Sequence, residues 1–123
     1  MEERLLRLHL GLAEVIEAHR PSVAVIEGVF AKGMRPQATI LMGQTRGALL
    51  LTCSLYKLRV VTFAASSVKA TVGGNGRAPK EKVRSSVEGH LRIDLPPVVK
   101  DGYDDSDALA LALCYVFRQG LLR

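Results

Sequence analysis

Three carboxylates stand at positions where they could carry out chemistry: Glu27, Asp104 and Asp107. Glu27 follows residues 23–26, an apolar run without polar alternation that predicts a strand buried on both faces, as in a parallel sheet flanked by helices. Ligands of open α/β sheets bind at the C-terminal ends of such strands. Glu27 is therefore either a functional carboxylate or a residue that leaves the sheet and meets solvent.

Asp104 and Asp107 bracket the sequence Asp-Asp-Ser-Asp, which directly precedes the apolar residues 108–117 and a predicted buried helix. Capping and the helix dipole account for one or two of these three aspartates. Asp104 and Asp107 are i and i+3, so they share one helix face and can converge on a single cation. Carboxylate oxygens suit Mg²⁺, and clustered carboxylates beside a basic surface are the ingredients of metal-assisted phosphodiester hydrolysis.

The net charge is +5, and the surplus is concentrated in one segment. Residues 57–92 hold eight Lys or Arg against two Glu, whereas the remaining chain holds nine against ten acids. This distribution indicates a polyanionic partner, nucleic acid first, or a solvated basic face. Within the segment, the glycine-rich residues 73–80 form either an ordinary turn or a loop that approaches phosphates, with Arg77 and Lys80 as charge partners.

The elements that must position these groups follow from hydrophobic periodicity. Residues 2–19 repeat apolar side chains at helical spacing, and an Arg-Pro pair ends that helix. Residues 37–56 predict a long helix, apolar almost all round, with sheet covering one face and another element the other. Gly43 and Gly47 allow close approach of a second helix, either across a dimer interface or within the chain. Arg46 points at a ligand or at solvent.

The second half of the chain predicts one strand and three helices. Residues 58–63 are an apolar, β-branched run and predict another core strand. A short helix follows, with Ser66 or Ser67 as its N-cap, and Pro79 suits the start of the next helix. In that helix the inward side chains are expected to be Val83, Val87 and Leu91, and the outward ones Lys82, Arg84 and Glu88.

Bulk composition predicts one globular domain. The chain has 123 residues, of which 48% are hydrophobic and 24% charged. It contains no apolar run of about 18 residues, and its N-terminus predicts a helix rather than a signal peptide, so we expect no membrane association. Cys53 and Cys114 lack metal-ligand spacing and are expected to be buried thiols in a reducing cytoplasm.

Four motifs occur in order along the chain. The first two are Ala-Val-Ile-Glu-Gly-Val-Phe at residues 24–30 and Leu-Met-Gly-Gln-Thr-Arg-Gly at residues 41–47. The third is Val-Lys-Ala-Thr-Val-Gly-Gly-Asn-Gly at residues 68–76, with Lys80 after it, and the fourth is Asp-Asp-Ser-Asp-Ala-Leu-Ala at residues 104–110. With these motifs the chain resembles the RuvC family of Holliday-junction resolvases, of the RNase H-like superfamily, over essentially its whole length. The resemblance implies an α/β fold with an RNase H-like mixed sheet flanked by helices, in one nuclease domain over residues 1–123.

The resemblance also implies roles for individual residues and partners. The catalytic metal ligands would be Glu27, Asp104 and Asp107, with Mg²⁺ as the cofactor and Mn²⁺ as a substitute. Phe30 would stack near the junction crossover, and Lys69 and Lys80 would contact phosphates of the scissile strand, near Arg77 of the loop. The partners would be four-way junction DNA, a second copy of the chain in a homodimer that cuts two strands symmetrically, and a branch-migration motor complex.

The sequence departs from the family pattern in one respect. Family members begin with a buried strand that carries an aspartate in an Asp-x-Gly context, followed by a hairpin that completes the sheet. No Ile-Asp-x-Gly motif occurs in these 123 residues, so the domain is expected to be N-terminally incomplete, without the first catalytic aspartate and the central strands. A truncated chain is the favoured explanation; a non-catalytic relative and a partner that supplies the strand are the alternatives.

Three functions compete on these grounds. The leading hypothesis is a Mg²⁺-dependent endonuclease that resolves four-way DNA junctions in recombination and repair, by water attack on a phosphodiester. The alternative is a catalytically inactive, dimeric junction-binding relative, whose affinity would depend on salt but not on Mg²⁺. An unrelated α/β protein with a capped acidic helix is the third, and it predicts no preference for junctions.

Overall fold

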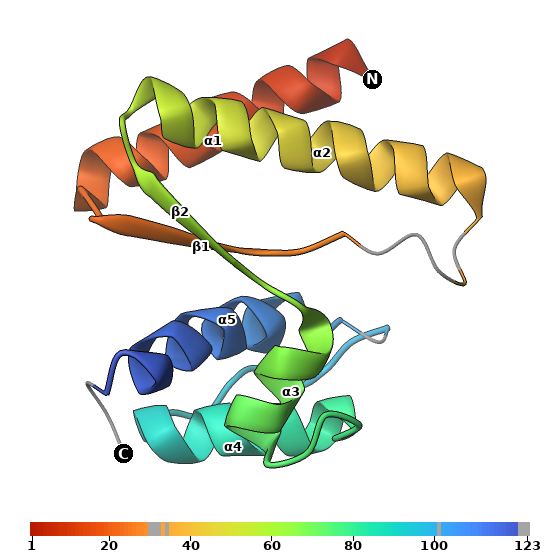
Figure 1. Cartoon of the computed structure of the whole chain (residues 1–123), viewed down its shortest axis with the longest axis vertical. Helices are drawn as coiled ribbons and strands as arrows, with labels where there is room; N and C mark the ends of the chain where they lie inside the picture. Colours follow the sequence, from red (N-terminus) through yellow and green to blue (C-terminus); the bar gives the residue numbers. More distant parts are fainter. Residues whose placement is uncertain (30–32, 34, 101, 121–123) are drawn as a thin grey trace. The chain divides into compact units, whose positions relative to one another are not determined.

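The computed structural model describes residues 1–29, 33, 35–100 and 102–120, in which five helices and two strands are formed. In chain order these are α1 (Glu2–His19), β1 (Val23–Glu27), α2 (Pro36–Leu55), β2 (Arg59–Phe63), α3 (Ala65–Gly73), α4 (Lys80–Leu91) and α5 (Asp104–Arg118) (Figure 1). The order and type of these elements agree with the sequence prediction. The chain divides into two compact units, Met1–Thr62 and Phe63–Arg123, which are described separately below.

The first unit contains two packed helices and a two-stranded parallel sheet. β1 and β2 are hydrogen-bonded neighbours, and α2 is the crossover between them. α1 ends where Arg20 adopts the left-handed conformation, with φ 46°, just before a proline. α1 and α2 are joined at His9, whose Nδ1 lies 2.7 Å from the hydroxyl of the fully buried Thr52. Helix packing and this polar contact together set the position of the strands that follow each helix.

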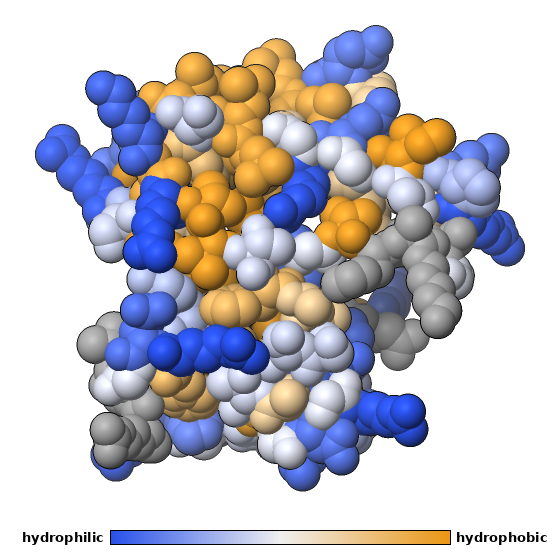
Figure 2. All heavy atoms as spheres, viewed as in Figure 1, coloured by the Kyte–Doolittle hydropathy of each residue, from blue (hydrophilic) through white to orange (hydrophobic). Residues whose placement is uncertain are grey.

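Burial in the first unit is shallower than the sequence predicts. Residues 23–26 are half-buried rather than buried, and α2 buries only Thr52 and Cys53. A sheet of two strands is too narrow to cover a 20-residue helix that is apolar all round. Apolar side chains of both helices are therefore exposed, and they include Leu6, Leu10, Val15, Ile40, Leu41, Met42, Leu51 and Leu55. Figure 2 shows a broad apolar surface, in orange, over the part of the view where Figure 1 draws the first unit. Gly43 and Gly47 also face open space, since a Cβ added at either meets nothing within 4 Å.

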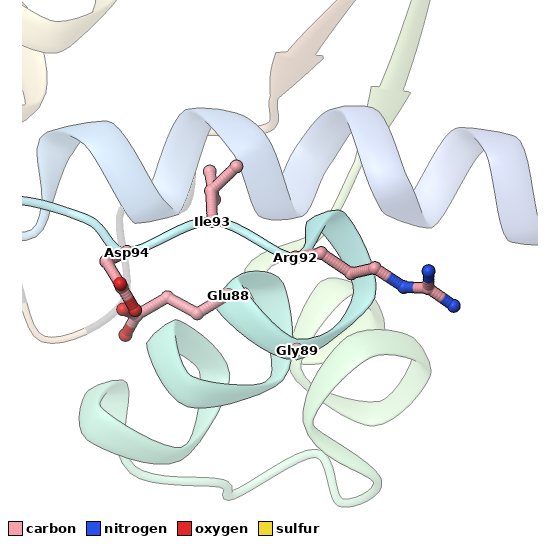
Figure 3. Close-up of a pocket in the computed structure, with 5 residues that line it drawn as sticks. All are labelled: Glu88, Gly89, Arg92, Ile93 and Asp94. Atoms are coloured by element: carbon pink, nitrogen blue, oxygen red, sulfur yellow. The ribbon is translucent and has the colours of Figure 1, made fainter.

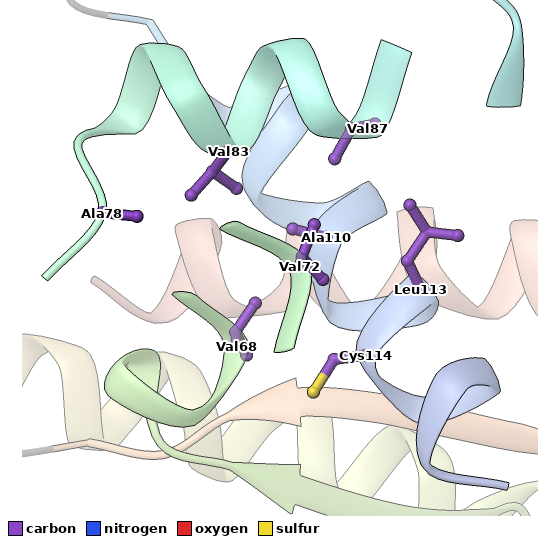
Figure 4. Close-up of a cluster of buried hydrophobic side chains, with 8 residues drawn as sticks. All are labelled: Val68, Val72, Ala78, Val83, Val87, Ala110, Leu113 and Cys114. Atoms are coloured by element: carbon purple, nitrogen blue, oxygen red, sulfur yellow. The ribbon is translucent and has the colours of Figure 1, made fainter. Parts of the chain in front are cut away.

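The second unit is built around one apolar core between α3, α4 and α5. Its buried members are Val68, Val72, Ala78, Val83, Val87, Ala110, Leu113 and Cys114 (Figure 4). The predicted N-cap of α3 is wrong: extended Ala64 follows β2 directly and the helix begins at Ala65, so neither Ser66 nor Ser67 precedes it. The core places the first turns of α4 and α5, which carry the candidate site residues, in one packed unit.

Two side chains of α4 do not lie where the sequence predicts. Leu91 was expected to point inward, but as the last residue of the helix it is 36% exposed. Arg84 was expected to point outward, but it is only 8% exposed. The prediction for Arg84 is wrong because its guanidinium finds acceptors inside the unit, on Asp105 and on the backbone carbonyl of Pro96.

The two cysteines are free and buried, as predicted. Burial raises the pKa of the Cys53 thiol, which favours its inert protonated form. In the part of the chain that the structure describes, no helix combines the length and the apolar character that crossing a membrane requires.

Gly73 offers a test of how closely the second unit is packed. Gly73→Ala should lower the free energy of unfolding by roughly 1–3 kcal/mol, as overpacking does. The added Cβ would lie 2.8 Å from Cβ of Ala78 and 3.2 Å from Cγ2 of Val83. Gly89→Ala on α4 is the control: its Cβ meets nothing within 4 Å, and it should raise stability by about 0.5–1 kcal/mol. Urea denaturation measures both, and equal effects of the two substitutions would contradict the packing.

Candidate functional site

The aspartates at the start of α5 have different surroundings, and Asp105 is the one held by the fold. Its Oδ1 accepts hydrogen bonds from the backbone N–H of Ser106 at 2.7 Å and from Nη1 of Arg84 at 3.0 Å. The hydroxyl of Ser106, which is 1% exposed, donates to the carbonyl of Tyr103 at 3.2 Å. The first turn of α5 is thus fixed by local side-chain bonds around Asp105, whereas its N-cap is Tyr103 and makes no side-chain capping hydrogen bond, so the capping role expected for the aspartates is wrong.

Asp104 and Asp107 keep their carboxylates toward solvent. Nζ of Lys80 donates to Oδ2 of Asp107 at 3.2 Å, with the two side chains 53% and 46% exposed. An ion pair as exposed as this one is weak, so both groups can exchange partners readily. Asp104 is exposed and makes no side-chain hydrogen bond or ion pair within the described residues. The predicted i, i+3 pair is therefore accessible to a cation.

Lys80 lies between a carboxylate and an aromatic ring at the start of α4. Its Nζ is 5.4 Å from the ring centroid of Tyr103, within the range of a cation–π contact. The hydroxyl of Tyr103 donates to Oε1 of Glu81 at 2.8 Å. The pKa of Glu81 is lowered, first by its backbone hydrogen bond at the helix start and then by the Tyr103 hydroxyl. These contacts join the first turns of α4 and α5.

The residues predicted to bind phosphate all lie in the second unit: Lys69 on α3, Arg77 in the following loop and Lys80 at the start of α4. Arg77 and Lys80 are exposed, and Lys69 is half-buried. The glycine-rich loop contains Gly74 with φ 81°, and the backbone N–H of Arg77 donates to Oδ1 of Asn75 at 2.8 Å. The loop is therefore a turn with its own hydrogen bond that presents Arg77 to solvent.

In the first unit, Arg46 fastens the ends of the two strands. Its Nη1 donates to the backbone carbonyl of Glu27 and its Nη2 to the hydroxyl of Thr62, each at 3.0 Å. The sequence predicted a ligand or solvent as the partner of Arg46, whereas its partner is the chain itself. The carboxylate of Glu27 is exposed at the end of β1, as either prediction for it requires. Hydrophobic periodicity could not predict these partners of Arg46, because one acceptor is a backbone carbonyl and the other lies on a separate strand.

The predicted metal ligands are distributed over both units. Glu27 belongs to the first unit, Asp104 and Asp107 belong to the second, and Phe30 lies outside the described residues. Among the residues that the structure describes, no group of three or more His, Cys, Asp or Glu is placed to hold a metal ion. Two carboxylates on one helical turn fit part of a Mg²⁺ coordination shell. The structure brings together Asp107 and Lys80, with Asp104 on the same first turn of α5, and the assignment of Glu27 to the same centre stays a prediction.

A shallow pocket lies at the other end of α4. It is lined by Glu88, Gly89, Arg92, Ile93 and Asp94 and has a volume of about 300 Å³ (Figure 3). One of its two carboxylates is already used, since Oε2 of Glu88 accepts the backbone N–H of Leu95 at 3.1 Å. None of the predicted site residues lines this pocket, so it is separate from the acidic turn of α5.

Comparison with known proteins decides the family. The family model described as crossover junction endodeoxyribonuclease RuvC matches residues 1–115. This chain belongs to the RuvC family. The RuvC resemblance that the four motifs carried is therefore confirmed.

Individual RuvC proteins support the same assignment. RuvC of Polynucleobacter asymbioticus is 40% identical over 114 residues, which are 93% of this chain and 63% of the relative. RuvC of Neorickettsia sennetsu is 43% identical over 112 residues, which are 91% of this chain and 66% of the relative. The chain thus spans just under two thirds of the length of these relatives.

The solved RuvC structures confirm the fold. Thermus thermophilus RuvC in complex with a Holliday junction substrate matches with a TM-score of 0.83 at 28% identity, over 98% of this chain and 70% of that one. A second structure of Thermus thermophilus RuvC matches with a TM-score of 0.75. The predicted RNase H-like α/β fold is therefore correct.

The Tyr103 contact predicts a measurable change in the acid titration of the site. Tyr103→Phe should raise the pKa of Glu81 only part of the way to its ordinary value of 4.5, because the backbone hydrogen bond remains. A lowered carboxyl pKa stabilises the fold above the unfolded pKa, and this contribution is lost as pH falls through the folded value. The variant should lose less stability than the wild type on acidification through that range. Carboxyl NMR titration gives the pKa, with Tyr115→Phe as the control; an unshifted Glu81 would rule out the contact.

Proposed function

We propose that this chain forms the nuclease domain, over residues 1–123, of a Mg²⁺-dependent endonuclease that resolves four-way DNA junctions in recombination and repair. The observation that carries the proposal is the first turn of α5, where Asp104 is exposed and Asp107 pairs with the exposed Lys80, while Asp105 is held by the buried Arg84. Family membership supports the same chemistry, because the matching model is that of a crossover junction endodeoxyribonuclease. The similar Thermus protein was solved with a Holliday junction substrate, which supports four-way DNA as the ligand.

In this proposal the residues divide by charge. The metal ligands are Glu27, Asp104 and Asp107, and Mn²⁺ can replace Mg²⁺ because carboxylates accept both ions. When bound, the divalent ion supplies an activated water and stabilises the leaving oxygen. The phosphate contacts are assigned to Lys69, Arg77 and Lys80, and the stacking contact at the crossover to Phe30. Lys80 has a second role in the free protein, where it neutralises Asp107 until a cation or a phosphate competes for it.

The α2 surface supports a homodimer as the active form. Gly43 and Gly47 have open space around them, and apolar side chains of the same helix, such as Leu51, are exposed. A second copy packed on this surface would bury it and would place two sites for symmetric cleavage. A branch-migration motor complex as further partner and a cytoplasmic location are part of the same proposal and rest on the family resemblance.

One observation favours a second function, that of an inactive junction binder. Within the described residues the first turn of α5 carries Asp104 and Asp107, and no group of three or more metal-binding side chains is formed. A protein with the basic residues of the second unit and an incomplete metal centre would bind four-way DNA without cutting it. The two functions separate in a single assay, because only the nuclease needs a divalent ion.

Asp107→Asn tests the nuclease proposal on a synthetic four-way junction. Extended upstream to an Asp-x-Gly strand, the wild type should cut in Mg²⁺ and not in EDTA, and the variant in the same form should be slower by about a hundredfold or more, because a lost ligand removes several kcal/mol of charge stabilisation. Junction affinity in EDTA should stay within a few-fold. Asp94→Asn is the control acid in the same unit, and it should cut normally. Retained cleavage by the Asp107 variant excludes this residue from the metal centre, whereas binding without cleavage by the wild type favours the inactive binder.

The salt dependence of junction binding tests the basic residues. Arg77→Ala and Lys80→Ala should each reduce the slope of log affinity against log salt by about 1. Each variant would make one phosphate contact fewer, so its binding to the junction would release fewer counterions. The slope is measured in EDTA by fluorescence anisotropy, so that cleavage does not interfere. Arg4→Ala, an exposed charge on α1, is the matched control and should leave the slope unchanged. An unchanged slope in both alanine variants would mean that Arg77 and Lys80 are ordinary solvated surface residues without phosphate contacts.

A further inference from the structure

Arg84 is a buried cation that the proposed function has not used. It is only 8% exposed, although it sits on a helix whose neighbouring Lys82 is exposed. Its Nη1 donates to Oδ1 of Asp105 at 3.0 Å, and its Nη2 donates to the backbone carbonyl of Pro96. A buried guanidinium needs such partners, because an unpaired charge in the interior is strongly disfavoured. The two acceptors therefore determine where this side chain is placed.

The same two bonds tie together three separate segments of the second unit. Arg84 belongs to α4, Pro96 to the connector that follows it, and Asp105 to the first turn of α5. The planar guanidinium offers several N–H donors in a fixed fork, so it can hold both acceptors at once in a way that a lysine ammonium cannot reproduce. Asp105 also accepts the N–H of Ser106, so its carboxylate connects Arg84 directly to the helix start.

The position of Arg84 relates it to the site. Lys80 lies one helical turn before it on α4, and Lys80 contacts Asp107 as Arg84 contacts Asp105. The two contacts differ in the burial of the cation: the Lys80 side chain is 53% exposed, whereas the Arg84 side chain is 9% exposed. The two carboxylates are similarly exposed, 46% for Asp107 and 42% for Asp105. The pair with the exposed lysine can exchange partners, while the pair with the buried arginine, which is part-buried, holds α5 against α4.

We propose that Arg84 is a positioning residue for the metal centre, which fixes the first turn of α5 so that the carboxylates of Asp104 and Asp107 converge on one ion. This inference rests on the proposed function for its ligand, a hard divalent cation. Arg84 itself touches neither the ion nor DNA. Residues behind metal ligands orient them, and losing one typically weakens metal affinity about 10- to 100-fold.

Electrostatics alone predicts the opposite result, which makes the test discriminating. Removing a positive charge near two carboxylates should strengthen cation binding slightly. Arg84→Met is expected to weaken it at least about tenfold. Lys82→Met removes the same charge from the same helix without touching Asp105 or Pro96, so its affinity should be unchanged or slightly tighter. Arg84→Lys, which keeps the charge but not the fork, should fall between the wild type and Arg84→Met.

The experiment is a Mn²⁺ titration of the chain followed by paramagnetic broadening of the amide signals of residues 104–107. Hydrogen exchange of the Ser106 and Asp107 amides is measured on the same variants without metal. Weaker Mn²⁺ binding and faster exchange in Arg84→Met, with Lys82→Met unchanged, support the positioning role. Mn²⁺ affinity in Arg84→Met equal to or above that of the wild type overturns it and leaves the proposed function intact. If Arg84→Met does not fold, Arg84→Lys carries the same comparison.

Failure of the proposed function gives a different pattern. If Mn²⁺ does not broaden residues 104–107 in the wild type, the metal role of Asp104 and Asp107 is refuted, and with it the statement that Arg84 positions metal ligands. Exchange then decides whether Arg84 fixes the turn at all. Protection of the Ser106 amide that falls at least about tenfold in Arg84→Met, and not in Lys82→Met, supports that part of the inference, and equal protection overturns it.

Discussion

The interior of the second unit depends on one buried cation, the guanidinium of Arg84. Its burial is tolerated only because an acceptor from the connector and a carboxylate from α5 meet it, and each acceptor is thereby held in place. The apolar core brings α4 and α5 together but does not fix how one helix is aligned along the other, because the hydrophobic effect is non-directional. The hydrogen bonds of Arg84 supply the register that the core lacks. The acidic turn of α5 is consequently presented in one fixed orientation.

Arg46 also fixes the chain in the first unit, through bonds to the two strands. It binds the backbone at the end of β1 and a hydroxyl near the end of β2, so it holds the peptide of Glu27 while leaving the carboxylate in solvent. In both units an arginine fixes the chain beside a candidate ligand and does not neutralise that ligand. The cations that remain exposed, Arg77 and Lys80, are then the ones suited to phosphate.

The two units differ in how completely their apolar surfaces are covered. The second has a continuous core in which Val87 and Cys114 are fully buried. The first has only two strands against helices that are apolar on several faces, so much of α1 and α2 stays exposed. An apolar surface of this kind on a folded unit is typical of an interaction face, and the open glycines of α2 make that helix the part best suited to close contact. In the proposed function this surface would serve dimer assembly and the acidic turn would serve metal binding.

The sequence alone determined the elements, the family and the candidate residues, because hydrophobic period, proline positions and ordered motifs are local properties of the chain. It placed Val83 and Val87 inside and identified Asp104 and Asp107 by their spacing. It could not say which of the aspartates would form structural hydrogen bonds. Tertiary structure decided that, by burying Arg84 against Asp105 and leaving Asp107 to the exposed Lys80. Helical period marks a face as polar or apolar, and a charge on the apolar side is stable only where distant segments supply acceptors. Those acceptors, a carbonyl in the connector and a carboxylate on α5, come together only when the chain has folded.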